Sequence, residues 1–133
     1  METITEDYVS FETAKLLKEK GFDEKVSTHY LVHPSGFPEF FDKKDEFTEP
    51  EDVWLKCPTH QMALKWLRGV HNVFIYIEPF ITTSGLQGYK PYCTKIGEEF
   101  MWINPLRRYS NTSSDTYEEA VEAALKYSLK NLI

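Results

Sequence analysis

The segment from Pro58 to Glu78 carries two apolar repeats in direct succession. Its first part has apolar residues at helical spacing, and Pro58 fits the first helical turn because a missing N–H costs nothing there. The expected buried stripe consists of Ala63, Trp66, Leu67 and Val70, with Met62 beside it. Residues 73–77 are then apolar on both faces of a strand. This pattern predicts a central strand covered on both sides, or a strand with one aromatic face turned to a partner.

Two further helices are predicted from their end signals. Ser10 is a suitable N-cap and Gly21 is a suitable residue after the last turn, which predicts a short amphipathic helix over 11–20. Thr116 and Glu119 form a capping box that starts a third helix. The apolar stripe expected for this third helix consists of Tyr117, Ala120, Val121, Ala124, Leu125, Ser128 and Leu132. Its alanines would let the helix approach a sheet closely.

A first pair of strands is predicted between the first two helices. Residues 26–32 and 37–42 form a hairpin around the turn residues 34–36. Pro38 assigns the second of these strands to a sheet edge, because proline cannot donate a ladder hydrogen bond. The charged stretch 42–56 is expected to be a mobile loop.

A second group of strands follows the helix–strand segment. Pro79 is expected to end its first strand. Residues 89–96 form the next strand, which Pro91 assigns to an edge or a bulge. Residues 100–103 form another, which Asn104 and Pro105 are expected to end. The polar stretch after it is expected to be a loop.

The order of these elements is helix, two strands, helix, three strands, helix. This order predicts an α+β fold, an antiparallel sheet of about five strands with three helices packed on one face. In the alternative arrangement, the two groups of strands form two separate small sheets. A length of 133 residues favours one globular domain over residues 1–133.

Composition and charge exclude several classes of function. The net charge of −6 argues against general binding of nucleic acids, which requires Lys and Arg against the phosphates. It also disfavours anionic membranes, and the longest apolar stretch, 73–77, is too short to cross a bilayer. The acidic, polar first residues do not resemble a signal peptide, and two cysteines do not make a disulfide framework. A cytoplasmic protein is expected.

Metal binding has weak candidates. Cys57 and His60 have the two-residue ligand spacing of zinc sites, and His29 and His33 are four residues apart. A second closely spaced cysteine pair is absent from the sequence, and Pro58 can start its helix without a metal. The pattern therefore predicts no metal and no cofactor.

Two catalytic interpretations depend on small clusters of reactive residues. Glu39, Asp42 and Lys44 have the composition of a metal-dependent nuclease centre, but they lead into the charged loop rather than a rigid element. Cys57 or Cys93 would need His60 or His71 as a base, and neither cysteine follows a sharp nucleophile turn. No catalytic residue is assigned.

Aromatic residues supply the candidate binding site. The chain has 9 Phe, 8 Tyr and 3 Trp, which is more than one small core needs. The predicted patch, on an outer sheet face, consists of Tyr76, Tyr89, Tyr92, Trp102 and Arg107. Such a patch would grip a peptide or stack bases. The opposing interpretation is that the third helix covers this face.

Three blocks of the chain carry a resemblance. They read YVSFETAKLLKEKGFDE (8–24), PTHQMALKWLRGVHNVFIYI (58–77) and TYEEAVEAALKYSLKNLI (116–133). Together these blocks, about 55 residues, resemble short uncharacterised proteins of gut Bacteroidales, their phages and their mobile elements. The resemblance implies a cytosolic accessory protein, phage-borne or carried on a mobile element, and implies no catalytic residues.

Three functions therefore compete. The first is a non-enzymatic protein that binds another protein. The second is a small metal-dependent hydrolase or nuclease. The third is a nucleic-acid-associated regulator, which would need Lys90, Lys95, Arg107 and Arg108 to form a local basic stripe. A homodimer through an edge strand at 37–42 or 89–96 is left open by the sequence.

Overall fold

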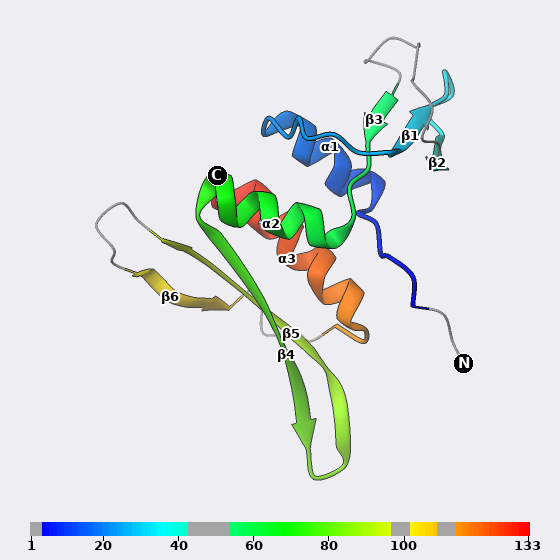
Figure 1. Cartoon of the computed structure of the whole chain (residues 1–133). Helices are drawn as coiled ribbons and strands as arrows, with labels where there is room; N and C mark the ends of the chain where they lie inside the picture. The colour runs from blue at the N-terminus through cyan, green and yellow to red at the C-terminus, as the bar shows by residue number, and fades with distance from the viewer. Residues whose placement is uncertain (1–3, 43–53, 97–101, 109–113) are drawn as a thin grey trace. The chain divides into compact units, whose positions relative to one another are not determined.

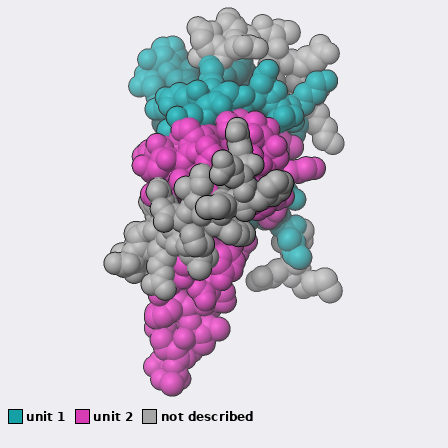
Figure 2. All heavy atoms as spheres, turned by 90° about the vertical axis from the view of Figure 1, so that its left-hand side faces the viewer, with its two compact units in different colours: residues 1–60 teal, residues 61–133 magenta. Residues whose placement is uncertain are grey.

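The computed structural model describes residues 4–42, 54–96 and 114–133, and the backbone of residues 102–108. It confirms the α+β class with antiparallel sheets and three helices (Figure 1). The described strands form two three-stranded sheets, ordered β2-β1-β3 and β4-β5-β6, as in the alternative of separate small sheets. The chain divides into two compact units, residues 1–60 and 61–133 (Figure 2). The elements are α1 (Phe11–Glu19), β1 (Thr28–Val32), β2 (Pro38–Asp42), β3 (Trp54–Lys56), α2 (His60–His71), β4 (Val73–Thr82), β5 (Gly85–Ile96), β6 (Trp102–Arg108) and α3 (Tyr117–Asn131).

In the first unit, the ends of α1 are set by the predicted signals. The Ser10 hydroxyl accepts a hydrogen bond from the backbone N–H of Thr13 at 3.2 Å. Gly21, just after the helix, has φ +92°, a conformation that glycine adopts without steric cost. The buried residues of the helix are Thr13, Ala14 and Leu17. The predicted helix over 11–20 is therefore confirmed to within one residue.

The β1–β2 hairpin is also as predicted. It turns through Gly36, whose φ of +87° again requires a glycine-like conformation. Pro38 is the first residue of β2, and β2 is an edge strand of its sheet. The proline therefore marks the edge correctly.

The predicted loop at 42–56 is wrong at its end. Trp54–Lys56 form β3, which pairs antiparallel with β1. The Trp54 ring packs edge-on against His29, with centroids 6.3 Å apart, and against Phe41 at 5.5 Å. Three residues are too few to show the alternation of apolar and polar side chains by which a strand is recognised. The sequence therefore shows no sign of this strand next to the charged residues. Residues 43–53 lie outside the described part of the chain.

Helix α2 begins slightly later than predicted, and one residue of its last turn is less buried than predicted. It begins at His60, so Pro58 precedes the helix; the Pro58 carbonyl accepts a hydrogen bond from the backbone N–H of Val9 at 3.1 Å. Val70, predicted to be buried, is 57% exposed. In this last turn His71 packs against Trp66 instead, with ring centroids 4.7 Å apart. Ala63, Trp66 and Leu67 are buried as predicted.

In the second unit, α3 packs on one face of the β4–β5 hairpin. The residues of the hairpin that are buried on this inner face include Val73, Pro91 and Cys93. The Cys93 Sγ lies 3.6 Å from the Ala124 carbonyl oxygen, to which it donates a weak hydrogen bond. Ala120 and Ala124 are fully buried, so their small side chains allow the close approach that the sequence predicted. Tyr117 is an exception to the predicted stripe, because it is exposed in the first turn.

Proline does not interrupt this sheet where the sequence predicted it would. β4 continues through Pro79 to Thr82, β6 continues through Pro105, and Pro91 lies in the central strand β5. For Pro79 and Pro91, the register of the β4–β5 pair explains why the strands continue. The backbone N–H of Ile96 donates to the Asn72 carbonyl at 3.0 Å, so every second pair from there along the ladder exchanges hydrogen bonds. Pro79 and Pro91 belong to the alternate pairs, whose nitrogens point away from this ladder.

Candidate binding surface

The face of the β4–β5 hairpin opposite α3, here called the outer face, is rich in aromatic residues. The side chains of every second residue of β4 lie on this outer face, because side chains of a strand alternate between the two faces of a sheet. The outer face consists of Phe74, Tyr76, Glu78 and Phe80 from β4 with Lys90, Tyr92 and Thr94 from β5. Both strands are anchored at one end by α3, and the hairpin extends past the helix at the other end (Figure 1).

Cross-strand contacts fix the side chains at the centre of the outer face. Tyr76 and Tyr92 are directly paired, and their rings stack with centroids 5.2 Å apart and planes at 26°. The Tyr92 hydroxyl donates to the Glu78 carboxylate at 2.7 Å. The stack buries Tyr92 but leaves Tyr76 53% exposed. At the centre of the face, the stack and the hydrogen bond therefore fix two aromatic rings, of which Tyr76 is exposed to solvent.

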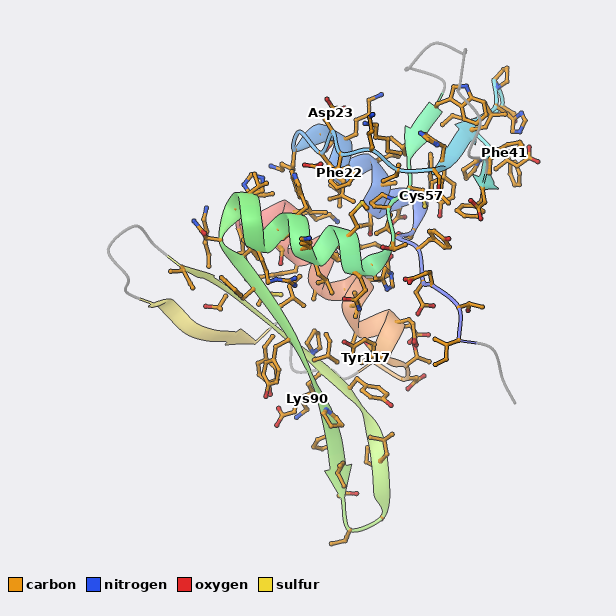
Figure 3. The ribbon with its side chains drawn as sticks, viewed as in Figure 1. Phe22, Asp23, Phe41, Cys57, Lys90 and Tyr117 are labelled. Atoms are coloured by element: carbon orange, nitrogen blue, oxygen red, sulfur yellow. The ribbon has the colours of Figure 1, made fainter. Side chains whose placement is uncertain are left out.

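The far part of the outer face combines an apolar ring with a cation. The Lys90 ammonium lies 4.1 Å from the centroid of the Phe80 ring, within the range of a cation–π interaction. Figure 3 labels Lys90 on the hairpin, away from Tyr117 at the start of α3. Phe74 and Phe80 are each 37% exposed. One acidic and one basic group leave the face without a net charge among its described side chains.

The end of the hairpin is apolar as well. Ile81 and Leu86 are directly paired there, after an irregularity between Phe80 and Ile81. They are 67% and 56% exposed, although both are large aliphatic residues. A two-residue turn, 83–84, connects the strands, and Gly85, the first residue of β5, has a φ of +106°.

The structure brings together only part of the predicted patch. Tyr76 and Tyr92 share the outer face, as predicted. Tyr89 lies on the opposite face, where its ring packs edge-on against Tyr117 at 6.0 Å. Residues 89 and 92 are three apart along one strand, so alternation separates them. Trp102 and Arg107 pair through their backbones with Ile96 and Cys93, and their side chains lie outside the described part of the chain.

Several residues of the outer face were missed. Phe74, Glu78 and Phe80 belong to it, and the exposed residues at the hairpin end extend it. The signal was present, since positions 74, 76, 78 and 80 have the same parity. Pro79, which is predicted to end the strand, hides this signal for Phe80.

The predicted metal candidates have other roles. His29 is buried beside Trp54, and burial lowers the pKa of its imidazole, partly offset by a hydrogen bond that the ring donates to the Ser27 backbone carbonyl. His33 contacts the Glu39 carboxylate at 2.8 Å. Cys57, which Figure 3 labels, is buried, and its thiol donates a hydrogen bond to the Val9 carbonyl oxygen at 3.4 Å. Within residues 4–42, 54–96 and 114–133, no three His, Cys, Asp or Glu side chains group together to hold a metal ion.

The described residues of the two other chemical clusters do not come together either. Glu39 and Asp42 lie three residues apart on β2, so alternation separates them, and Lys44 lies outside the described residues. Lys90 is on the outer face, whereas the Lys95 ammonium donates to the Leu132 carbonyl at the end of α3 at 2.9 Å. These two lysines therefore do not belong to one basic stripe.

The cysteines are expected to be unreactive in the native protein. Cys57 and Cys93 have no exposed surface, and burial raises the pKa of the Cys93 thiol. An opening that costs about 3 kcal/mol is populated below about 1% of the time, so labelling should slow at least roughly a hundredfold relative to the unfolded chain. Ellman's reagent, added with and without urea, measures this. Fast labelling of one thiol in the native protein would restore the nucleophile interpretation.

Comparison with known proteins returned no match: no protein-family model, no curated protein and no solved structure corresponds to the chain. Among the described helices, none combines the length and the apolar character needed to span a membrane.

Proposed function

We propose that this protein is a non-enzymatic interaction protein whose β4–β5 hairpin binds another protein. The observation that carries the proposal is the row of exposed aromatic rings on the outer face, Phe74, Tyr76 and Phe80. Apolar surface in contact with water is unfavourable by roughly 25 cal/mol per Å². Contiguous exposed patches of this kind are typical of sites that a partner covers.

The chemistry of the outer face fits a protein partner. Aromatic rings dominate the energetic centres of protein interfaces, and a polar rim excludes water from them. Here the Tyr76–Tyr92 stack supplies a rigid ring, so binding would order few side chains. Glu78 and Lys90 supply polar groups beside it. Among the described side chains of this face the charges of Glu78 and Lys90 balance, which supports a peptide or protein surface rather than a phosphate backbone.

The accessory role that the sequence resemblance implies is part of this proposal. The partner would be a cytoplasmic protein of the host or of a phage. The resemblance and the acidic net charge of −6 support this context, and the partner itself is the unknown that the experiment identifies.

The test is an affinity pull-down of tagged protein from host lysate, with and without nuclease. The variant Tyr76→Ala with Phe80→Ala should lose a stoichiometric protein partner that the wild type retains after nuclease treatment. Phe37→Ala is the matched control, because Phe37 is an exposed aromatic residue in the β1–β2 turn. Circular dichroism must show that all three proteins are folded.

Two results would contradict the proposal. A partner that still binds the double variant would lie on another surface. A partner lost on nuclease treatment would favour the nucleic-acid-associated regulator instead.

A further inference from the structure

Strand β4 is an edge strand of its sheet, with β5 on one side and no described strand on the other. The hydrogen bond from Ile96 to Asn72 fixes which backbone groups point outward. Position 72 and the even positions after it bond to β5, so the odd positions direct their N–H and C=O groups to the outer edge. Val73, Ile75 and Ile77 thus offer donors and acceptors at this edge. Pro79 offers only its carbonyl, because proline has no N–H.

The sequence along this edge is self-complementary. Residues 73–77 read Val-Phe-Ile-Tyr-Ile, which is palindromic by residue class: β-branched residues at 73, 75 and 77, and aromatic residues at 74 and 76. In an antiparallel pair of identical strands related by a two-fold axis, residue i faces j and j faces i, so a palindromic segment places residues of the same class opposite each other. The same five residues carry no charge, so a chain of net charge −6 would meet its copy at a neutral segment.

We propose that two copies of this chain pair antiparallel through β4 about a two-fold axis at Ile75. Ile75 then faces its own copy, and Val73 faces Ile77 of the other chain. These three pairs exchange hydrogen bonds and none of them uses Pro79. Phe74 and Tyr76 face one another across the axis as non-hydrogen-bonded pairs, the closer of the two pair types in an antiparallel sheet.

The neighbouring register is worse for a physical reason. An axis at Ile77 would place Pro79 opposite Ile75, where the proline lacks the N–H that the pair needs. It would also place Glu78 opposite Tyr76 rather than an aromatic ring opposite an aromatic ring. Pro79 therefore limits the pairing to the uncharged segment before it.

The other described edge strands carry features that disfavour such pairing. β6, the second edge of the same sheet, contains Pro105 and ends in Arg107 and Arg108. β2 begins with Pro38 and carries Glu39 and Asp42, features that block pairing with a second chain. β3 has only three residues. β5, a predicted dimer edge at 89–96, is instead the central strand of its sheet, so that expectation is wrong. β4 is the edge that is long and carries no charge or proline over residues 73–77.

This inference goes beyond the proposed function, although it concerns the same hairpin. A two-fold axis perpendicular to the sheet would place both copies of α3 on one side and both outer faces on the other. The partner-binding surface would then continue across two chains. The dimer is expected to form from the purified protein alone, without the partner. The dimer proposal can therefore be wrong while the partner proposal is right, and the partner proposal can be wrong while the dimer proposal is right.

The test introduces charged residues at positions 74 and 76, which face each other in the proposed dimer. Phe74→Lys with Tyr76→Lys places lysine opposite lysine across the axis, and Phe74→Lys with Tyr76→Glu places lysine opposite glutamate. Analytical ultracentrifugation over a range of protein concentrations should show a monomer–dimer equilibrium for the wild type. The Lys/Lys variant should lose the dimer, and the Lys/Glu variant should retain a dimer that 1 M salt weakens. Both variants lose the same Tyr76–Tyr92 stack, so they are matched in folding.

Cross-linking gives the register independently. An equal mixture of Phe74→Cys and Tyr76→Cys proteins should form a mixed disulfide dimer under mild oxidation, and neither protein should form one alone. Cys57 and Cys93 are buried and do not interfere. A monomeric wild type at all concentrations, a Lys/Lys variant that dimerises like the wild type, or an open-ended assembly would each overturn the proposal.

Discussion

Replacing Val73 by aspartate is expected to destabilise the second unit severely, whereas replacing its neighbour Phe74 by aspartate is expected to leave it folded. Val73 has no exposed surface and lies on the inner face of β4, which α3 covers. A buried charge without a partner costs roughly 3–5 kcal/mol, a large part of the 5–15 kcal/mol that holds a typical domain together. Phe74 lies on the outer face, so its change should cost about 1 kcal/mol or less.

Urea unfolding followed by circular dichroism measures both free energies. Val73→Ala is the control for the lost volume, because it shortens the same side chain without adding a charge. It should fall between the other two variants. Equal losses for Val73→Asp and Phe74→Asp would mean that both faces of β4 are buried, and the outer face would then no longer be a candidate for partner binding.

The sequence predicted those parts of the fold that depend on local chemistry. The hydroxyl of Thr116 accepts from the Glu119 N–H at 3.1 Å, and Ser10 caps α1 in the same way. Such signals act over three or four residues and can be found without knowing the tertiary structure. The exposure of Val70 could not be found in this way, because whether a residue in a last turn is covered depends on where the chain goes next.

The strand ends were less predictable because a proline can either end strand pairing or leave it intact. A proline whose nitrogen points into a ladder ends the pairing, and one whose nitrogen points away does not. Which case applies to Pro79 and Pro91 is decided by the register, and register is a property of two strands. Only the paired structure shows that both nitrogens avoid the β4–β5 ladder.

The candidate site was half predictable for a related reason. Tyr76 and Tyr92 lie on different strands, and their direct pairing depends on the turn at the hairpin end. The placement of Tyr89 on the opposite face from Tyr92 needs only the parity of one strand, so the sequence contained it. The contact of Lys90 with Phe80 needs both the continuation of β4 past Pro79 and the cross-strand register.

A matched pair of core truncations is expected to show whether residues 1–133 fold as one domain. Leu17 in α1 and Leu125 in α3 are almost completely buried, and they belong to different compact units. Truncation of such a residue to alanine should lower the free energy of unfolding by about 2–5 kcal/mol. Under the single-domain prediction, either variant lowers one shared unfolding transition.

Hydrogen exchange with mass spectrometry reads the two units separately within one molecule. If the chain unfolds as one domain, Leu17→Ala should speed the exchange of the slowest amides in α3 as much as in α1, and Leu125→Ala should do the same in reverse, because a global opening exposes all of them together. Lys15→Ala is a suitable surface control on α1, since Lys15 is exposed and its change should alter neither rate appreciably. Acceleration confined to residues 1–60 for the first variant, and to residues 61–133 for the second, would instead show two independently stable domains. The hairpin that carries the outer face would then be a property of the second domain alone, and that domain would be the smallest piece in which to seek both the partner and the dimer.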